Sequence, residues 1–121
     1  MEGLRRKMIF AMFSAYGLSA CATPVPSLGR GLPRTFVPTP DFDRRIVEQF
    51  PVGSEENKLL AELHGERFSI TENQDRSKPY RFSALYVAQN IPCRESWRIQ
   101  WNAEQGRIVD ITGWYSGEVC L

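Results

Sequence analysis

The first hydrophobic pattern along the chain has the spacing of a helix face. Phe42, Ile46 and Phe50 recur at every fourth position. They predict a short helix over residues 40–50, with Thr39 as its N-cap.

A second helix is predicted to follow a short turn. Ser54 has the side chain of an N-cap residue, and Leu59, Leu60 and Leu63 form the apolar stripe of the helix after it. Gly65 is suited to end this helix in a left-handed conformation.

From residue 80 onward the hydrophobic period changes to two, which is the period of a strand. Three strands are predicted, over residues 80–87, 96–102 and 107–116. Residues 68–70 have the composition of one further short extended piece. We therefore expect an α+β domain, with two short N-terminal helices packed on one face of a roughly three-stranded antiparallel sheet.

The loop between the last two strands sets their register. A two-residue loop would place Ile99 opposite Asp110 and mix apolar and polar positions on one face. A three-residue loop over 104–106, with Gly106 in the left-handed position, keeps the apolar partners together. The predicted pairs are Trp101 with Val109, Ile99 with Ile111, and Trp97 with Gly113, over which the Trp97 ring can lie.

The N-terminus carries a basic cluster, an apolar stretch and then a cysteine. The basic residues 5–7 precede the uncharged stretch 8–17, which as a helix would span only about half of a bilayer core. With Leu18-Ser19-Ala20-Cys21 after it, this arrangement resembles the signal peptide and lipobox of bacterial lipoproteins. The resemblance implies cleavage before Cys21 and acyl chains on that residue. The alternative is a plain signal peptide or a core helix that contains Cys21.

Three regions follow from this interpretation. Residues 1–20 are predicted to be the signal peptide, 21–40 the lipidated cysteine and a proline-rich tether, and 41–121 the folded domain. Five of the eight prolines lie in residues 22–40. Ala22, at the position after the cysteine, permits export to the outer membrane by analogy with enteric sorting, so we expect a lipid-anchored protein that faces the periplasm.

The formal charge of the whole chain is misleading if the signal peptide is removed. Residues 1–20 contain three of the 15 basic and one of the 14 acidic residues, which leaves 12 basic and 13 acidic residues and a net charge of −1. No basic patch remains to indicate a nucleic-acid partner. No metal-binding cluster is expected either.

The three cysteines divide into one lipid site and one pair. With Cys21 acylated, Cys93 and Cys120 form an even pair in an oxidising compartment, which predicts a disulfide. A disulfide that closes a loop of this length stabilises the folded state by roughly 3.5 kcal/mol in the chain-entropy model. Two free thiols or a metal pair are the alternatives.

Candidate catalytic groups do not converge in this sequence. His64 is the only histidine, and it lies where a helix is predicted to end and where its ring can interact with terminal carbonyls. No G-x-S-x-G motif is present. We therefore expect neither an enzyme nor a cofactor.

One tryptophan is predicted to lie apart from the core. The chosen register places Trp114 on the sheet face opposite Trp97, with Ser96 across from it and Arg94 and Arg98 on the diagonals. A tryptophan flanked by arginines on an uncovered face is typical of a partner-binding site. The alternative is that the tether or the 66–79 segment covers this face and Trp114 is packed.

Together these features resemble the BamE/SmpA/OmlA-type outer-membrane lipoproteins, whose domain has the β-lactamase-inhibitor-protein fold. The resemblance covers about residues 44–115. Its matching residues are Val52, Gly53, Ser54, Leu60, Leu63, Trp97, Ile99, Gly106 and Ile108. It implies a non-enzymatic module that binds another envelope protein, in outer-membrane assembly or maintenance. The alternative is a periplasmic inhibitor, or a module that sequesters a ligand, acting on a hydrolase or a cell-wall fragment.

Intact-mass spectrometry of the native product tests the predicted anchor. We expect a chain that begins at Cys21 and carries a diacylglycerol and a further acyl chain, because the lipobox directs both modifications. An unmodified polypeptide that still begins at Met1 would contradict the anchor and the predicted location together.

Overall fold

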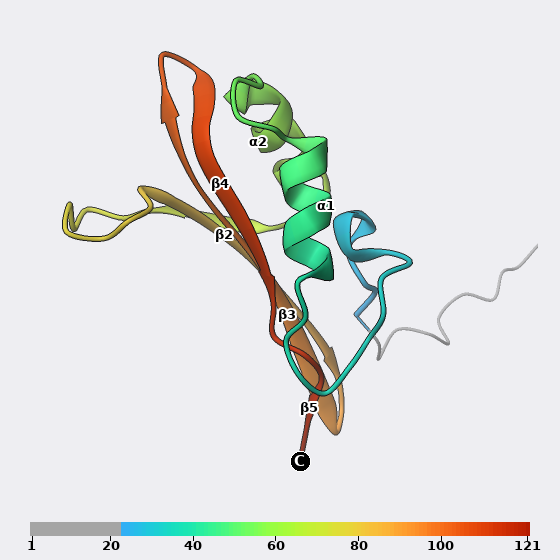
Figure 1. The fold of residues 1–121 in the computed structure, drawn as a ribbon. Helices are drawn as coiled ribbons and strands as arrows, with labels where there is room; N and C mark the ends of the chain where they lie inside the picture. The colour runs from blue at the N-terminus through green and yellow to red at the C-terminus, as the bar shows by residue number, and fades with distance from the viewer. Residues whose placement is uncertain (1–22) are drawn as a thin grey trace, which may run out of the picture.

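The chain folds into two helices and one antiparallel sheet (Figure 1). The computed structural model describes residues 23–121. Their elements are the 3₁₀ turn η1 (Ser27–Gly29), the helices α1 (Asp41–Gln49) and α2 (Glu56–Gly65), and the strands β1 (Ser69–Glu72), β2 (Phe82–Asn90), β3 (Cys93–Glu104), β4 (Arg107–Tyr115) and β5 (Val119–Cys120). The predicted signal peptide, residues 1–20, and the lipidation site Cys21 lie outside the described residues.

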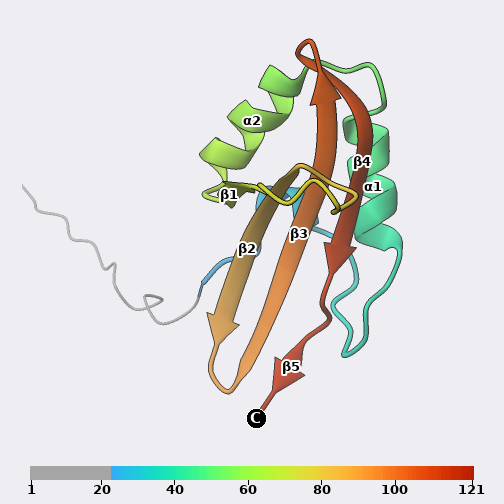
Figure 2. The same ribbon diagram turned by 90° about the vertical axis from the view of Figure 1, so that its left-hand side faces the viewer.

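The sheet has the strand order β1-β2-β3-β4, and β5 pairs with the beginning of β3. Both helices lie on the same side of this sheet (Figures 1 and 2). The α+β class and the two helices on one face are confirmed. The sheet is larger than the three strands predicted, because the short strands β1 and β5 extend it.

The helices begin differently from the prediction. Pro40 is the N-cap of α1 in place of Thr39, and no side chain caps the first turn of either helix. Glu55 precedes α2, while the carbonyl of Ser54 accepts the Ile108 N–H at 2.9 Å. The start of α2 is therefore fixed by backbone pairing with the β3–β4 hairpin.

The end of α2 also differs from the prediction. Gly65 is the last residue of the helix, and the left-handed conformation falls two residues later, on Arg67, whose φ is 66°. The Arg67 N–H donates to the carbonyl of His64, and the Phe68 N–H donates to that of Leu63. These bonds supply partners to the last turn without a left-handed glycine.

The predicted register between β3 and β4 is wrong by two residues. The hairpin uses a two-residue turn, Gln105-Gly106, with both residues at positive φ (52° and 76°), as in a type I′ turn. The register then shifts between Asn102 and Ala103, where one strand has an extra residue. The observed pairs are Trp97 with Tyr115, Ile99 with Gly113, and Trp101 with Ile111. The bulge therefore restores the common apolar face that the tight turn alone would lose.

Two glycines make room for large side chains of the core. A Cβ on Gly113 would lie 2.9 Å from Ile46 Cγ1 and 3.1 Å from Phe42 Cδ2. Gly113 therefore accommodates α1, and the prediction that the Trp97 ring lies over it is wrong. That ring instead lies against Gly29, where a Cβ would be 2.6 Å from the indole Nε1.

The core lies between the sheet and the helices. It is built from fully buried side chains of α1, α2 and the inward positions of the strands. The largest of them are Trp101, Phe42, Ile46, Leu59, Leu63, Ile99 and Ile108. The Trp101 indole N–H donates to Glu56 Oε2 at 2.8 Å, so the polar atom of the largest buried ring has a partner.

The proline-rich segment is not a free tether from residue 23 onward. Leu28 is 2% exposed and belongs to the core, and Val25 and Leu32 pack against it. The Tyr86 hydroxyl donates to the Pro24 carbonyl at 2.7 Å, and the Leu28 N–H donates to Glu66 Oε1 at 2.9 Å. The packed unit therefore begins before residue 41, because apolar residues among the prolines complete the helix side of the sheet.

The predicted disulfide is present between Cys93 and Cys120. The two residues are direct cross-strand partners of β3 and β5, with Cα atoms 3.9 Å apart. The bond therefore fixes the C-terminal strand to the sheet.

Substitution of Gly113 tests the packing of α1 on β4. Gly113→Ala places a methyl group against the Ile46 and Phe42 side chains, so we expect it to lower the free energy of unfolding by about 1–3 kcal/mol. Urea denaturation measures this change.

The matched control is Gly65→Ala. A Cβ at this position meets nothing within 4 Å, so the free energy of unfolding should stay within about 1 kcal/mol of the wild-type value or rise. Equal effects of the two substitutions would contradict the close packing at Gly113.

Candidate functional site

The side of the sheet that faces away from the helices forms the candidate site. We call it the open face and define it by the outward residues of the three long strands. They are Ser83, Leu85 and Val87 of β2, Ser96, Arg98 and Gln100 of β3, and Thr112 and Trp114 of β4. Figure 2 looks onto this side, with α1 and α2 behind the strands.

Trp114 is the one large aromatic side chain of the open face. It is 45% exposed and lies at the β4 end of a cross-strand row with Arg98 and Leu85. The Arg98 guanidinium carbon lies 6.0 Å from the centre of the Trp114 ring, at the limit of a cation–π contact. Of the two segments proposed to cover Trp114, the N-terminal segment packs on the helix side through Val25, Leu28 and Leu32.

A shallow hollow of about 310 Å³ lies beside the Trp114 ring. Arg98, Gln100, Thr112, Gly113 and Trp114 line it. These residues offer a guanidinium, an amide and an aromatic ring, and no nucleophile paired with a base, while the Thr112 hydroxyl already donates to Asp43 Oδ1 at 2.9 Å. The chemistry of this hollow is that of recognition through stacking and hydrogen bonds.

The predicted neighbours of Trp114 are corrected by the observed register. Arg98, and not Ser96, lies directly across from Trp114. Arg94 pairs with Val119 and lies four residues before Arg98 in β3, so it does not belong to the Trp114 site. The error follows from the two-residue turn and the bulge, each of which shifts β4 by one residue relative to the predicted pairing.

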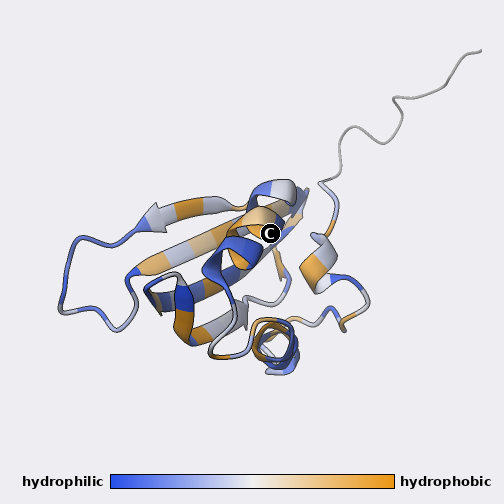
Figure 3. Ribbon diagram, turned by 90° about the horizontal axis from the view of Figure 1, so that it is seen from above, coloured by the Kyte–Doolittle hydropathy of each residue, from blue (hydrophilic) through white to orange (hydrophobic). Residues whose placement is uncertain are grey.

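The β1–β2 loop projects away from the sheet at one end of the open face (Figure 1). Its residues are hydrophilic along most of its length (Figure 3). Asn102 of β3 holds its base, because the Asn102 side chain accepts the Arg81 N–H and donates to the Pro79 carbonyl, both at 2.8 Å. The loop and Asn102 enclose a polar hollow of about 340 Å³.

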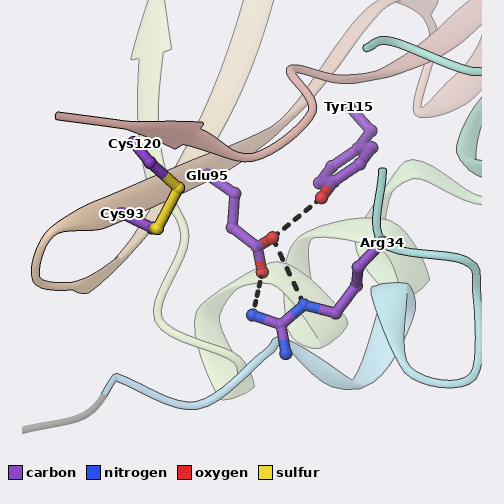
Figure 4. Close-up of a disulfide and its surroundings, with 5 residues drawn as sticks. All are labelled: Arg34, Cys93, Glu95, Tyr115 and Cys120. Carbon is purple, nitrogen blue, oxygen red and sulfur yellow. Dashed lines mark hydrogen bonds and ion pairs between the residues drawn. A yellow bond between two sulfur atoms is a disulfide. The ribbon is translucent and has the colours of Figure 1, made fainter. Parts of the chain in front are cut away.

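An ion pair between a half-exposed arginine and a buried carboxylate lies on the opposite side of the sheet (Figure 4). Glu95 is 1% exposed, and its carboxylate accepts two hydrogen bonds from the Arg34 guanidinium, at 2.6 and 3.3 Å. The Tyr115 hydroxyl donates a third bond to it, at 2.8 Å. Burial, followed by this bond to Glu95, raises the pKa of Tyr115 well above its usual value.

The sequence prediction missed this ion pair although a signal was present. Glu95 has the same strand phase as Trp97, Ile99 and Trp101, so the period of two already places its carboxylate on the core face. The predicted strand began at residue 96 and left Glu95 out. Arg34 had no such signal, because it lies in a segment without periodicity.

A second carboxyl group lies under the N-terminal segment. Burial and a hydrogen bond with Glu62 raise the pKa of Glu66 to about 7. The bond from the Leu28 N–H acts in the opposite direction. Glu66 therefore connects the end of α2 to η1 and changes its charge near neutral pH.

The remaining predicted groups stay apart from one another. His64 lies exposed in the last turn of α2, and no second catalytic group contacts it in the structure from residue 23 onward. Within residues 23–121, no three metal-ligating side chains of histidine, cysteine, aspartate or glutamate gather in one place. No helix in this range has the length and apolar composition needed to cross a bilayer.

The chain was compared with known proteins. Neither a protein-family model, nor a curated protein, nor a solved structure matches it.

Glu66 gives the domain a pH dependence with a definite sign. Its folded-state pKa of about 7 exceeds the usual 4.5, so the folded state holds the proton more tightly. Stability is then lost as the pH rises from about 4.5 through 7. We expect Glu66→Gln to remove this loss, as measured by urea denaturation at intervals from pH 5 to 8. Parallel pH profiles of the two proteins would contradict the assignment.

Proposed function

We propose that this chain is a non-enzymatic lipoprotein of the bacterial envelope, of BamE/OmlA type, whose α+β domain binds another envelope protein through the open face. The observation that carries the proposal is the exposure of Trp114 on the edge strand β4 of an otherwise regular sheet face. Partly exposed aromatic residues beside arginine are the residue types that dominate binding energy at protein interfaces.

The surroundings of Trp114 support a binding role more than a packing role. Its row across the sheet continues through the charged Arg98 to the half-buried Leu85, so a strip of one aromatic, one cationic and one aliphatic side chain crosses three strands. Small polar residues flank this strip on both sides, as Ser83, Ser96 and Thr112 do. A partner could bury the exposed part of the indole ring without displacing any described segment of the chain.

The anchor and the location are part of the same proposal and rest on the residues of the N-terminus. The lipobox cysteine is Cys21, and Pro24 and Val25 already contact the domain. Only residues 22 and 23 then separate the acylated residue from the first residue that contacts the domain. We infer that the domain lies close to the periplasmic side of the outer membrane, and that it is not held away from the bilayer by a long tether.

The second candidate function is inhibition of a periplasmic hydrolase or capture of a cell-wall fragment. The projecting β1–β2 loop favours it, because an exposed polar loop on a firm base can enter the active site of another protein. Saturable inhibition of a purified periplasmic hydrolase by the full chain would support this alternative over the open face.

Replacement of Trp114 tests the proposed surface. We expect Trp114→Ala to leave the thermal midpoint nearly unchanged, because the ring is half exposed. It should abolish the crosslinked partner that formaldehyde treatment of intact cells yields with the wild-type chain. A hot-spot side chain of this kind contributes about 2 kcal/mol or more to binding.

The matched control is Phe36→Ala. It removes another aromatic ring that is 73% exposed but lies outside the open face. This variant should retain the crosslinked partner. A large loss of stability in Trp114→Ala, with the partner still bound, would place Trp114 in the core and remove the proposed surface.

A further inference from the structure

The second half of β2 has an unpaired edge. β1 pairs with β2 only from Phe82 to Leu85, whereas β2 continues to Asn90. From Tyr86 onward, β2 is therefore paired with β3 on one side alone. An open strand edge of this kind is a template for a further strand.

The register shows which main-chain groups point to this edge. The Ser116 N–H donates to the Ser96 carbonyl, so Ser96 directs its main chain toward β4 and away from β2. Its partner on β2 is Val87, which in an antiparallel pair must then direct its own N–H and C=O to the opposite side. Gln89, two residues further on, does the same. Among residues 23–121, no backbone bond outside the strand ladders uses these groups.

A groove of about 780 Å³ runs beside the beginning of this edge, at Tyr86 and Val87. Residues 23–27 form its far wall, which the hydrogen bond from the Tyr86 hydroxyl to Pro24 holds in place. Leu85 and Val87 supply apolar side chains, and Arg30 and Arg67 supply two exposed positive charges. Glu66 is the one carboxyl group among the lining residues.

We propose that an extended, acidic segment of a partner polypeptide binds in this groove and adds as a strand to the β2 edge at Val87 and Gln89. Main-chain hydrogen bonds would provide the affinity, and the two arginines would select a negatively charged segment. The inference rests on the proposed function, since it takes the domain to be a protein-binding module.

The walls of the groove favour a single extended segment over a second copy of this chain. A strand that already belongs to a sheet brings a neighbouring strand about 4.8 Å from its other side. Residues 23–27 occupy that side of the groove. A lone segment has no such neighbour and avoids the collision.

A synthetic hexapeptide of alternating valine and glutamate is the probe. We expect amide exchange of Val87 and Gln89 to be fast in the free ¹⁵N-labelled full chain and at least tenfold slower with saturating peptide. Tyr86 and Ala88, which bond to β3, should be protected in both states. The same peptide with lysine in place of glutamate should bind at least tenfold more weakly.

Gln89→Pro is the matching variant. It removes one edge N–H and leaves the β2–β3 bonds intact, because proline is tolerated where a strand N–H faces outward. We expect at least a tenfold loss of peptide affinity, whereas Gln89→Ala retains the N–H and the affinity. The peptide and exchange measurements stand even if the proline variant does not fold.

Two outcomes of the exchange measurement would overturn the proposal: protection of Val87 and Gln89 in the free chain, or protection that rises with protein concentration and so indicates self-association. Two outcomes of the peptide measurement would also overturn it: equal binding of the two peptides, or no saturable binding.

Trp114→Ala separates this proposal from the proposed function. Peptide binding that survives Trp114→Ala, together with loss of the envelope crosslink, supports both. A crosslink that survives Trp114→Ala, with peptide bound, contradicts only the open face.

Discussion

The carboxylate of Glu95 is the constraint on which the arrangement of this domain depends. It lies fully buried in the core face of β3, where an unpaired charge would cost several kcal/mol. Arg34 and Tyr115 supply the hydrogen bonds that make this position tolerable. Arg34 lies 61 residues earlier in the chain, so it can bond to the Glu95 carboxylate only if the N-terminal segment packs against the sheet. The nearby disulfide fixes the strand that carries Glu95 to the C-terminus (Figure 4).

The docked segment gives the two sides of the sheet different roles. On the helix side, Leu28 completes the core and Gly29 receives the Trp97 ring. The other side keeps its outward residues accessible, with Trp114 beside Arg98. The same segment also forms the far wall of the groove at the β2 edge. The Arg34–Glu95 ion pair therefore holds the segment that forms this wall, although neither residue lies on the open face.

Much of the fold could be predicted from hydrophobic periodicity. The spacing of Phe42, Ile46 and Phe50 located α1, and alternation located β2, β3 and β4 with errors of a few residues at their ends. Strands β1 and β5 were not predicted as such, because two to four residues are too few to establish a period.

The β3–β4 register was missed because a tight turn and a bulge compensate each other in strand phase, and alternation alone cannot detect such a pair. The sheet face of Trp114 was predicted, since strand phase survives a shift of two residues, but its exposure was left open, and Arg94 was misplaced by that same shift. The docking of residues 23–40 could not be predicted, because it depends on long-range contacts of isolated residues such as Leu28 and Arg34.

Amide hydrogen exchange at Leu28 and Gly29 tests the docking of the N-terminal segment most directly. Both N–H groups are bonded, that of Leu28 to Glu66 and that of Gly29 to the Pro26 carbonyl. We predict exchange at these two positions that is as slow as in the interior of α1 in the wild-type chain, and that becomes at least tenfold faster in Arg34→Ala. Exchange at the rate of an unstructured peptide in the wild-type chain would show that the segment is a free tether and would contradict the account.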